Sequence, residues 1–507
     1  MGPSDFQPSS EQALPATPFE WYMLTDHSTR HPMNFVFCFA IRGDLNVAQL
    51  QRAFLLAIEM HPLLTSVAVP TSAWPRYEWR KRDLDLSAML DERDPTEGLP
   101  ARYESDAINP MTGVTCRMRI YNEKPDAIES ERAWTVAVEF HHAVSDGLRA
   151  LEFCSDVFFQ YERMSNDSTS VENGCEQNDK SDQPAKESRR TIAPQLLVDR
   201  GIMDRRIPHP VSRGTAMRFL ALELVKFLFA FPVRMSRLSR NRKGNPTRDS
   251  IDAHAEWSES VREVIRWQSF GLSHLEFSPE VAKTLREFAQ QHGGSLNNLL
   301  LAVTLRAFAN QQRGWFMGIG SWVAVLPVNM IRASKQRVPC HNGIGYAFLR
   351  RKRDQCVDWF RNFLTLKMDI DAIQDWKLAG LFLDALDRLQ RLPKWLANLV
   401  LWGSRPGSFV WSYVGDPLRR FPNRLQEKDG NVWLGGAKLE GLSAAPPTRP
   451  GTELAILATL WQDSIRLYFR FDEQEISVTH AKWLRYLVAK EVLAVVESIR
   501  AGDTFPG

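Results

Sequence analysis

The sequence predicts an α/β protein with two domains, and three observations carry that prediction. The chain has 507 residues, which is more than one hydrophobic core usually supports. Segments with the two-residue period of half-buried strands alternate with segments that have the period of amphipathic helices. The hydrophobic fraction of 44% and the charged fraction of 24% are ordinary for a globular protein. We therefore expect sheets covered by helices, in two units.

The first unit is predicted over residues 18 to 162. Residues 1 to 17 are polar and rich in proline, which predicts a disordered N-terminus. A buried strand is then expected over residues 35 to 41. Asn46 is placed to cap a helix over residues 47 to 58, and a further strand follows His61 and Pro62.

Residues 134 to 148 combine a strand with a turn that carries titratable groups. Apolar residues alternate with small and polar ones up to Phe140, which predicts a strand with one buried face. His141 and His142 follow at once, and apolar residues at helical spacing resume over residues 148 to 161. The two histidines are therefore predicted to lie on a strand-to-helix turn.

The middle of the chain differs in composition from both ends. Residues 163 to 215 are predicted to form a disordered, low-complexity insert, because few apolar residues are available to offset ordering entropy. Residues 216 to 265 form an expected helical segment and linker. Within it, residues 216 to 243 are apolar and then basic, which suits either the headgroup region of an anionic membrane or a helix packed on its own protein with a solvated basic tail. The segment is too charged to span a bilayer.

The second unit is predicted over residues 266 to 507. Ser278 and Ser295 are expected to cap two successive helices. The apolar stretch over residues 353 to 405 is expected to be helical and contains Trp376, Trp395 and Trp402; it could serve as a lid, a tunnel wall, a membrane-facing surface or a plain helical core. Expected strands lie at 272 to 277, 322 to 328, 344 to 349, 408 to 414, 454 to 461 and 464 to 471, with a closing helix at 478 to 499. Asn342-Gly343 marks an expected turn before the strand at 344 to 349.

Several classes of function are disfavoured by composition and by missing motifs. The formal charge of +3 is too small to indicate nucleic-acid binding. The six cysteines are far apart and form no C-x-x-C pair, so reduced thiols are expected rather than a zinc site or disulfides. No signal peptide is recognised, and a cytoplasmic protein is expected, with membrane contact at its inner face as an option. A metal at His141 and His142 is not expected, because adjacent strand residues point to opposite faces.

The pattern His-His-x-x-x-Asp-Gly, which ends at Gly147, resembles the active-site motif of a superfamily of acyltransferases that use CoA or carrier-protein thioesters. That superfamily includes chloramphenicol acetyltransferase, peptide-synthetase condensation domains and bacterial wax ester synthases. A chance match to the four fixed positions is on the order of one in a thousand for a chain of this length. Four further segments resemble family motifs with alterations: His61-Pro62-Leu63-Leu64-Thr65 (Thr65 for Arg), Ser295-Leu296-Asn297-Asn298 (Asn298 for Asp), Leu326-Pro327-Val328-Asn329 (with its arginine one place late, at Arg332) and Ser412-Tyr413-Val414-Gly415 (Tyr413 for Asn).

The resemblance implies two chloramphenicol acetyltransferase-like lobes that form a V with an active-site tunnel between them. It implies that His142 is the general base, which takes a proton from an acceptor hydroxyl or amine as that group attacks an acyl thioester. Imidazole titrates near neutral pH, and general base catalysis typically contributes about 10²- to 10⁴-fold. The thioester is already activated, so no nucleophilic side chain is required.

The resemblance also suggests roles for the residues around His142. His141 and Asp146 are expected to be structural, with Asp146 either capping the following helix or pairing with an arginine, for which Arg332 is the candidate. Gly147 is expected to leave room for a close backbone approach. By position, Asn297 and Ser412 are candidates for oxyanion stabilisation.

The predicted function is acyl transfer from a thioester, by preference acyl-CoA, to the hydroxyl of a small lipophilic acceptor. Two alternatives stay open: a condensation-type amide or ester synthase that uses a carrier-protein thioester, and a homologue that binds an acyl chain or a partner without turnover. No permanently bound cofactor is expected, because acyl-CoA or an acyl carrier protein would act as co-substrate. The lipid preference depends on the apolar and basic stretches, including residues 216 to 243.

Overall fold

The computed structural model describes most of both predicted units. The described residues are 13–72, 76–81, 89–91, 108–123, 132–172, 232–238, 261–262, 272–311, 320–330, 338–397, 407–420, 426–428 and 431–502.

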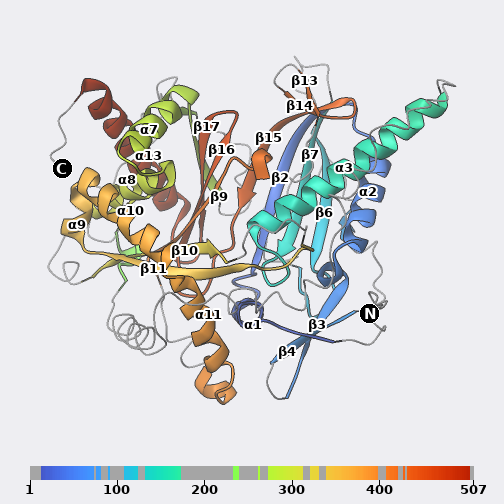
Figure 1. Cartoon of the computed structure of the whole chain (residues 1–507), viewed down its shortest axis with the longest axis horizontal. Coiled ribbons are helices and arrows are strands. Elements are labelled where there is room, and N and C mark those ends of the chain that lie inside the picture. The colour runs from blue at the N-terminus through green and yellow to red at the C-terminus, as the bar shows by residue number, and fades with distance from the viewer. Residues whose placement is uncertain are drawn as a thin grey trace, which may run out of the picture.

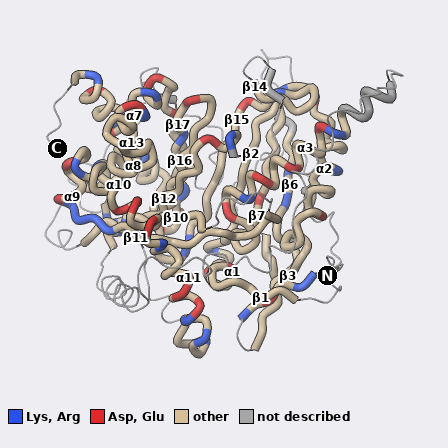
Figure 2. Tube along the Cα trace, in the orientation of Figure 1, with Lys and Arg blue, Asp and Glu red and all other residues tan. Residues whose placement is uncertain are grey.

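The described chain forms two lobes, each built on a seven-stranded sheet, and Figure 1 shows the two sheets side by side. The predicted α/β class with two lobes is thus confirmed. The N-terminal sheet has the order β13-β14-β15-β2-β7-β6-β5, where the edge strand β5 is Leu90–Asp91, and the C-terminal sheet has the order β11-β10-β12-β16-β17-β9-β8. Charges of both signs are interspersed over both lobes (Figure 2).

The N-terminal sheet is centred on β7 (Ala133–His141), which pairs antiparallel with β2 (Asn34–Gly43) and with β6 (Cys116–Glu123). Two helices, α2 (Val47–Glu59) and α3 (Gly147–Glu172), pack together beside it. Each of these except β6 was predicted from sequence, and the side chain of Asn46 caps α2 as expected by accepting from the Gln49 N–H at 3.1 Å.

Ordered structure in this lobe begins earlier and continues further than predicted. The strand β1 (Leu14–Pro15) pairs with β4 (Tyr77–Lys81), and Thr17 caps α1 (Pro18–Asp26) through a reciprocal pair of hydrogen bonds with Glu20. The predicted disorder of residues 1 to 17 is therefore wrong for this last part, whereas residues 1 to 12 lie outside the described residues. The helix α3 also continues to Glu172, beyond the expected boundary at residue 162.

The C-terminal sheet is covered by helices on the side away from the other lobe (Figure 1). Its core joins the inner faces of those helices to the sheet. The strands are β8 (Val261–Arg262), β9 (Leu272–Phe277), β10 (Trp322–Asn329), β11 (Ile344–Arg351), β12 (Phe409–Gly415), β16 (Leu454–Trp461) and β17 (Ser464–Phe471). The helices on that side are α7 (Pro279–Gln291), α8 (Leu296–Ala309), α9 (Arg353–Val357), α10 (Trp359–Asp375) and α13 (Val478–Ala501). Helix α11 (Leu378–Leu389) instead packs against β11 and against α1 of the N-terminal lobe. Ser295 caps α8, but the side chain of Ser278 makes no cap hydrogen bond to α7.

Strands of the C-terminal unit join the N-terminal sheet, which the predicted division at residue 266 did not anticipate. The strand β15 (Ala437–Ala445) pairs antiparallel with β2, and β14 (Asn431–Leu434) and β13 (Gln426–Lys428) extend the N-terminal sheet beyond it. The hydroxyl of Tyr468 donates to the Leu442 carbonyl at 2.8 Å, which links β17 of one sheet to β15 of the other. The C-terminal unit therefore contributes to both sheets.

The segment predicted to contact membranes, residues 216 to 243, is described only over residues 232–238. Val233, Met235 and Leu238 are buried in the core of the C-terminal lobe. Glu453 accepts hydrogen bonds from the backbone N–H of Ser236 at 2.7 Å and from its hydroxyl at 3.0 Å. Residues 232–238 are thus packed on the protein itself, as the second of the two alternatives predicts, and the rest of 216 to 243 lies outside the described residues. Of the helices that the structure describes, none is both long enough and apolar enough to cross a membrane.

The predicted helical stretch over residues 353 to 405 is helical over most of its described part. The core alternative is right for the inner face of α10, where Trp359 and Phe363 are buried. It is wrong for Trp376 and Trp395, which are 45% and 70% exposed. Trp402 lies outside the described residues.

Candidate active site

The predicted strand-to-helix turn lies at the end of β7, where the two lobes meet. His141 is the last residue of β7 and pairs with Asn34 of β2. The backbone N–H of His141 donates to Thr115 O at 2.9 Å, and that of His142 donates to Met33 O at 2.7 Å. Backbone from both sides therefore fixes the position of the two histidines.

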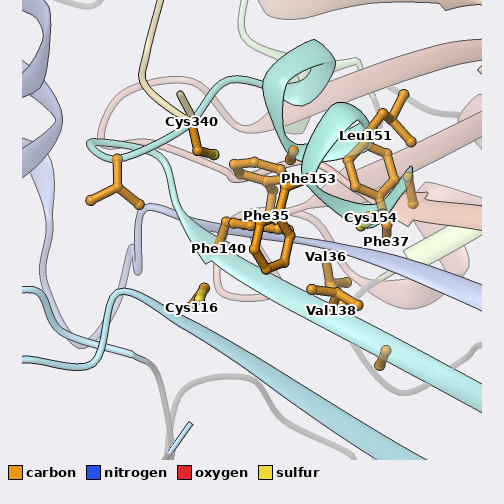
Figure 3. Packing of buried hydrophobic residues seen from close by; sticks show 14 of the residues in the cluster. Phe35, Val36, Phe37, Cys116, Val138, Phe140, Leu151, Phe153, Cys154 and Cys340 are labelled. Atoms are coloured by element: carbon orange, nitrogen blue, oxygen red, sulfur yellow. The ribbon is translucent and has the colours of Figure 1, made fainter. Parts of the chain in front are cut away.

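Aromatic rings surround the imidazole of His142. The Phe35 ring centroid lies 5.1 Å from that of His142 and 5.5 Å from the stacked ring of Phe140. Phe19 of α1 lies 6.5 Å away on an edge-to-face approach. Figure 3 shows Phe35 and Phe140 packed with Phe153 of α3 at this end of the sheet. His142 is only 9% exposed, so its ring is held in an apolar environment.

The hydrogen bonds of His142 indicate which ring nitrogen carries the proton. Its Nδ1 lies 2.9 Å from the carbonyl oxygen of Ser145. A carbonyl oxygen only accepts, and the amide nitrogen of Asn342, 3.1 Å from Nδ1, already donates to the His142 carbonyl. The neutral ring therefore holds its proton on Nδ1 and the lone pair on Nε2. Burial lowers the pKa of His142 below 6.5, although the Ser145 bond and the Asp146 carboxylate partly oppose that shift. The ring is therefore a neutral base at pH 7, with Nε2 as its basic atom.

His141 uses both ring nitrogens within the protein. Its Nδ1 accepts from the backbone N–H of Ala143 at 3.1 Å, so the proton lies on Nε2, which faces Nδ1 of His27 at 3.0 Å. Burial, together with the neighbouring His27 and His142, holds the pKa of His141 well below 6.5. The side chain is fully buried. These contacts suit the structural role that the resemblance implies.

The carboxylate of Asp146 both caps a helix and joins the lobes. One oxygen accepts from the backbone N–H groups of Leu148 and Arg149, at 2.9 and 3.0 Å, which caps α3. The other oxygen accepts from the backbone N–H of Gly343, in the segment before β11, at 2.8 Å. The predicted partner Arg332 lies outside the described residues, so that pairing stays a prediction.

Gly147 has more space than its predicted role requires. A Cβ atom at this position would meet the Phe37 ring at 3.9 Å, an ordinary van der Waals distance. The close backbone approach that we expected for Gly147 is thus not made by the described parts of the chain.

Residues 338–343 complete the site from the C-terminal lobe, and sequence reasoning interpreted their end only as a turn. The backbone N–H of Cys340 donates to Nδ1 of His61 at 2.7 Å, and its thiol lies 3.1 Å from the hydroxyl of Ser145. The side-chain amide of Asn342 donates to the carbonyl of His142 at 2.5 Å. The segment has no helical or strand period, so no local pattern could identify these contacts.

His61, in the His-Pro segment, hydrogen-bonds to residues on both sides of the histidine turn. Nε2 of His61 lies 3.1 Å from the carboxylate of Asp156 on α3, and both side chains are buried. Since Nδ1 of His61 accepts from Cys340, the ring donates its Nε2 proton to Asp156. His61 therefore links α3 to the segment that contacts Ser145 and His142.

The two oxyanion candidates lie on opposite faces of β12. Asn297, at the start of α8, accepts from the indole N–H of Trp411 at 2.8 Å, and Trp411 packs in the core beneath α8. Ser412 points the other way by strand alternation, with Val410 and Val414, which pack on the cluster that contains Phe35. The structure thus places Ser412 on the face toward the N-terminal lobe and does not bring Asn297 to the same face.

Neither a metal centre nor a nucleophilic thiol is indicated within the described ranges. Those ranges contain no group of three or more His, Cys, Asp or Glu side chains arranged to hold a metal ion. The five cysteines described are unpaired and buried. Burial raises the pKa values of the Cys116, Cys154 and Cys340 thiols, so these remain protonated.

Comparison with known proteins establishes the fold but not a sequence family. Neither a protein-family model nor a curated protein sequence matches this chain. Solved structures do match over nearly their whole length. The first condensation domain of the CDA synthetase has a TM-score of 0.59 at 13% identity, covering 96% of this chain and 97% of that one.

Two further matches are a second condensation domain and an acetyltransferase. The starter condensation domain of rhizomide synthetase RzmA, solved in complex with C8-CoA and Leu-SNAC, has a TM-score of 0.57 at 11% identity and covers 95% of this chain and 94% of that one. TRI3 trichothecene 15-O-acetyltransferase from Fusarium sporotrichioides has a TM-score of 0.60 at 11% identity, with coverage of 96% and 94%. The resemblance stated from the sequence motifs is thereby confirmed at the level of the fold, which this chain shares with condensation domains and with this acetyltransferase.

Proposed function

We propose that this protein transfers an acyl group from a thioester to the hydroxyl of a lipophilic acceptor, with His142 as the general base. The observation that carries the proposal is the hydrogen bond from Nδ1 of His142 to Ser145 O. It keeps the basic lone pair on Nε2, and burial keeps the ring neutral at pH 7. Nothing in the described part of the chain hydrogen-bonds to that nitrogen, so it is free to accept a substrate proton.

The proposed reaction follows from the chemistry of that nitrogen. Nε2 of His142 takes the proton of the acceptor O–H while the oxygen attacks the thioester carbonyl and forms a C–O bond. The tetrahedral intermediate then collapses, the C–S bond breaks, and the thiolate leaves with the proton that Nε2 returns. The products are an ester and a free thiol, and the imidazole is again neutral.

The surroundings of His142 support a lipophilic acceptor. Phe19 lies 5.0 Å from Tyr346 and 6.4 Å from Phe382, ring centroid to ring centroid, and Phe35 lies 5.1 Å from the imidazole of His142. Apolar side chains beside the base favour burial of a hydrocarbon substrate, at about 25 cal/mol for each Å² removed from water. Acyl-CoA is the preferred donor, and a carrier-protein thioester is the alternative. RzmA is a condensation domain that was solved with C8-CoA, so this fold accommodates a CoA thioester.

The test supplies acyl-CoA thioesters of several chain lengths with a panel of alcohols and amines, and follows thiol release and product mass. We expect His142→Ala to lower the rate by about 10²- to 10⁴-fold. The matched control is His292→Ala, because His292 lies at the end of α7, where its Nδ1 bonds to Phe288 O. Equal rates for wild type and His142→Ala would refute the general-base role.

The two rival functions give different outcomes in the same assay. Transfer from acyl-pantetheine on a carrier protein, but not from acyl-CoA, would indicate a condensation-type synthase. Saturable binding of acyl-CoA without thiol release for any acceptor would indicate a binding protein that has lost turnover.

A further inference from the structure

We propose that Asn342 is a positioning residue by which the C-terminal lobe holds His142 in its catalytic orientation. This inference rests on the proposed function of His142 as the base. Asn342 belongs to the segment that enters β11 of the C-terminal sheet, whereas His142 follows β7 of the N-terminal sheet. The contact therefore joins two elements whose relative position depends on how the lobes dock.

The side-chain amide of Asn342 is held in one orientation. Its nitrogen donates to the carbonyl of His142 at 2.5 Å and lies 3.1 Å from Nδ1 of the same residue. Its oxygen accepts from the backbone N–H of Ile344 at 3.2 Å. A reversed amide would place two acceptor oxygens 2.5 Å apart and two donors together at Ile344, so the orientation follows from the contacts.

The amide makes one hydrogen bond to His142, at its carbonyl, and its nitrogen also lies beside the imidazole ring. The bond to the carbonyl fixes the backbone from which the imidazole projects. The nitrogen beside Nδ1 places a neutral donor next to the ring, where a carboxylate would instead stabilise the imidazolium ion. Asn342 is only 4% exposed, so water cannot readily replace its hydrogen bond to the His142 carbonyl.

Contacts on both sides of Asn342 make this arrangement dependent on the lobe interface. Gly343 donates to the carboxylate of Asp146 at 2.8 Å, and Cys340 donates to His61 at 2.7 Å. All three donors lie in residues 338–343, and all three acceptors lie in the N-terminal lobe. If the lobes separate, the segment withdraws and His142 loses the amide, so the base is assembled only when the lobes are docked.

The experiment compares Asn342→Ala and Asn342→Asp with wild type by two independent measurements. The ring ¹⁵N shifts of His142 are followed against pH in histidine-labelled protein, with His142→Ala used to assign them. The pH profile of kcat/KM is measured with the acyl-CoA and alcohol that wild type uses. Asn362→Ala is the matched control, because Asn362 is a buried asparagine that accepts from Arg351 at 3.2 Å on α10.

We expect Asn342→Asp to move the titration of His142, and the acid limb of the profile, upward by about one pH unit or more. Asn342→Ala should lower kcat by about 10- to 100-fold with KM little changed, because the base is no longer aligned. Asn362→Ala should alter neither measurement.

Unchanged titration in Asn342→Asp, together with unchanged kcat in Asn342→Ala, would overturn the inference. If Asn342→Ala does not fold, the nearly isosteric Asn342→Asp still decides it by titration. The proposed function fails separately: a shifted titration in a protein without thioester turnover would retain the contact and reject the reaction. Turnover that depends on His142 but not on Asn342 would retain the reaction and reject the positioning role of Asn342.

Discussion

Gly343 donates its backbone N–H to the carboxylate of Asp146 across the two lobes, at 2.8 Å. The same carboxylate caps α3 with its other oxygen. A residue that the sequence motif suggests as a partner of an arginine is therefore, within the described structure, bonded to backbone N–H groups from both lobes. Because His142 lies four residues before Asp146, the capping of α3 and the docking of the lobes constrain the same turn.

Replacing Asp146 should cost more stability than the loss of a helix cap alone. Asp146→Ala removes the cap of α3, worth about 1 kcal/mol, and leaves the buried Gly343 N–H without its acceptor, worth about 1–3 kcal/mol more. Chemical denaturation monitored by fluorescence measures the free energy of unfolding. Asp358→Ala is the control, because Asp358 caps α10 by accepting from Arg361 at 3.0 Å. An equal loss in the two variants would show that the inter-lobe bond contributes nothing.

The strand and helix around the two histidines could be predicted because their signals are local. Alternation up to Phe140 and helical spacing after Gly147 depend on each residue's own neighbours in sequence, and both elements form there, although α3 continues to Glu172. The same holds for the caps at Asn46 and Ser295, where a short polar side chain reaches an N–H three residues ahead.

Non-local pairing could not be predicted in the same way. The strand β15 joins β2, whose residues lie some four hundred positions earlier in the chain, and no period in either segment specifies that partner. Asn342 was interpreted only as part of a turn, because its importance comes from the position of His142 in space. The role of a residue that connects distant elements depends on its contacts in space, and a single sequence does not show those contacts.

Stability should fall at acid pH because of His274. Burial, and to a lesser extent Arg466 and Arg485, lower its pKa from 6.5 to about 4. Below pH 6.5 the unfolded chain is protonated at this histidine, whereas the folded protein stays unprotonated down to about pH 4. The contribution of the neutral ring to the free energy of unfolding is therefore fully present above pH 6.5 and is lost as the pH falls from 6.5 to about 4.

The expected loss from His274 is about 2 kcal/mol between pH 7 and pH 5. His274→Gln should remove that part of the pH dependence, as measured by denaturant unfolding at both pH values. His292→Gln serves as the control, since that ring lies at the exposed end of α7. An unaltered difference between pH 7 and pH 5 in His274→Gln would assign the acid sensitivity to other groups.

Substitutions of Ser412 and Asn297, the two oxyanion candidates, should have different effects because the two residues lie on opposite faces of β12. Ser412 shares its face with Val410 and Val414, which pack toward the N-terminal lobe, whereas Asn297 bonds to Trp411 on the side of α8. Loss of an oxyanion donor typically lowers kcat by about 10²- to 10³-fold. We expect a decrease of this size in Ser412→Ala with little change in KM, while Asn297→Ala should mainly lower the melting temperature by removing the acceptor of the Trp411 indole. The reverse pattern would assign the oxyanion to the free amide nitrogen of Asn297, and it would require the start of α8 to approach the thioester carbonyl from the helix side of the sheet.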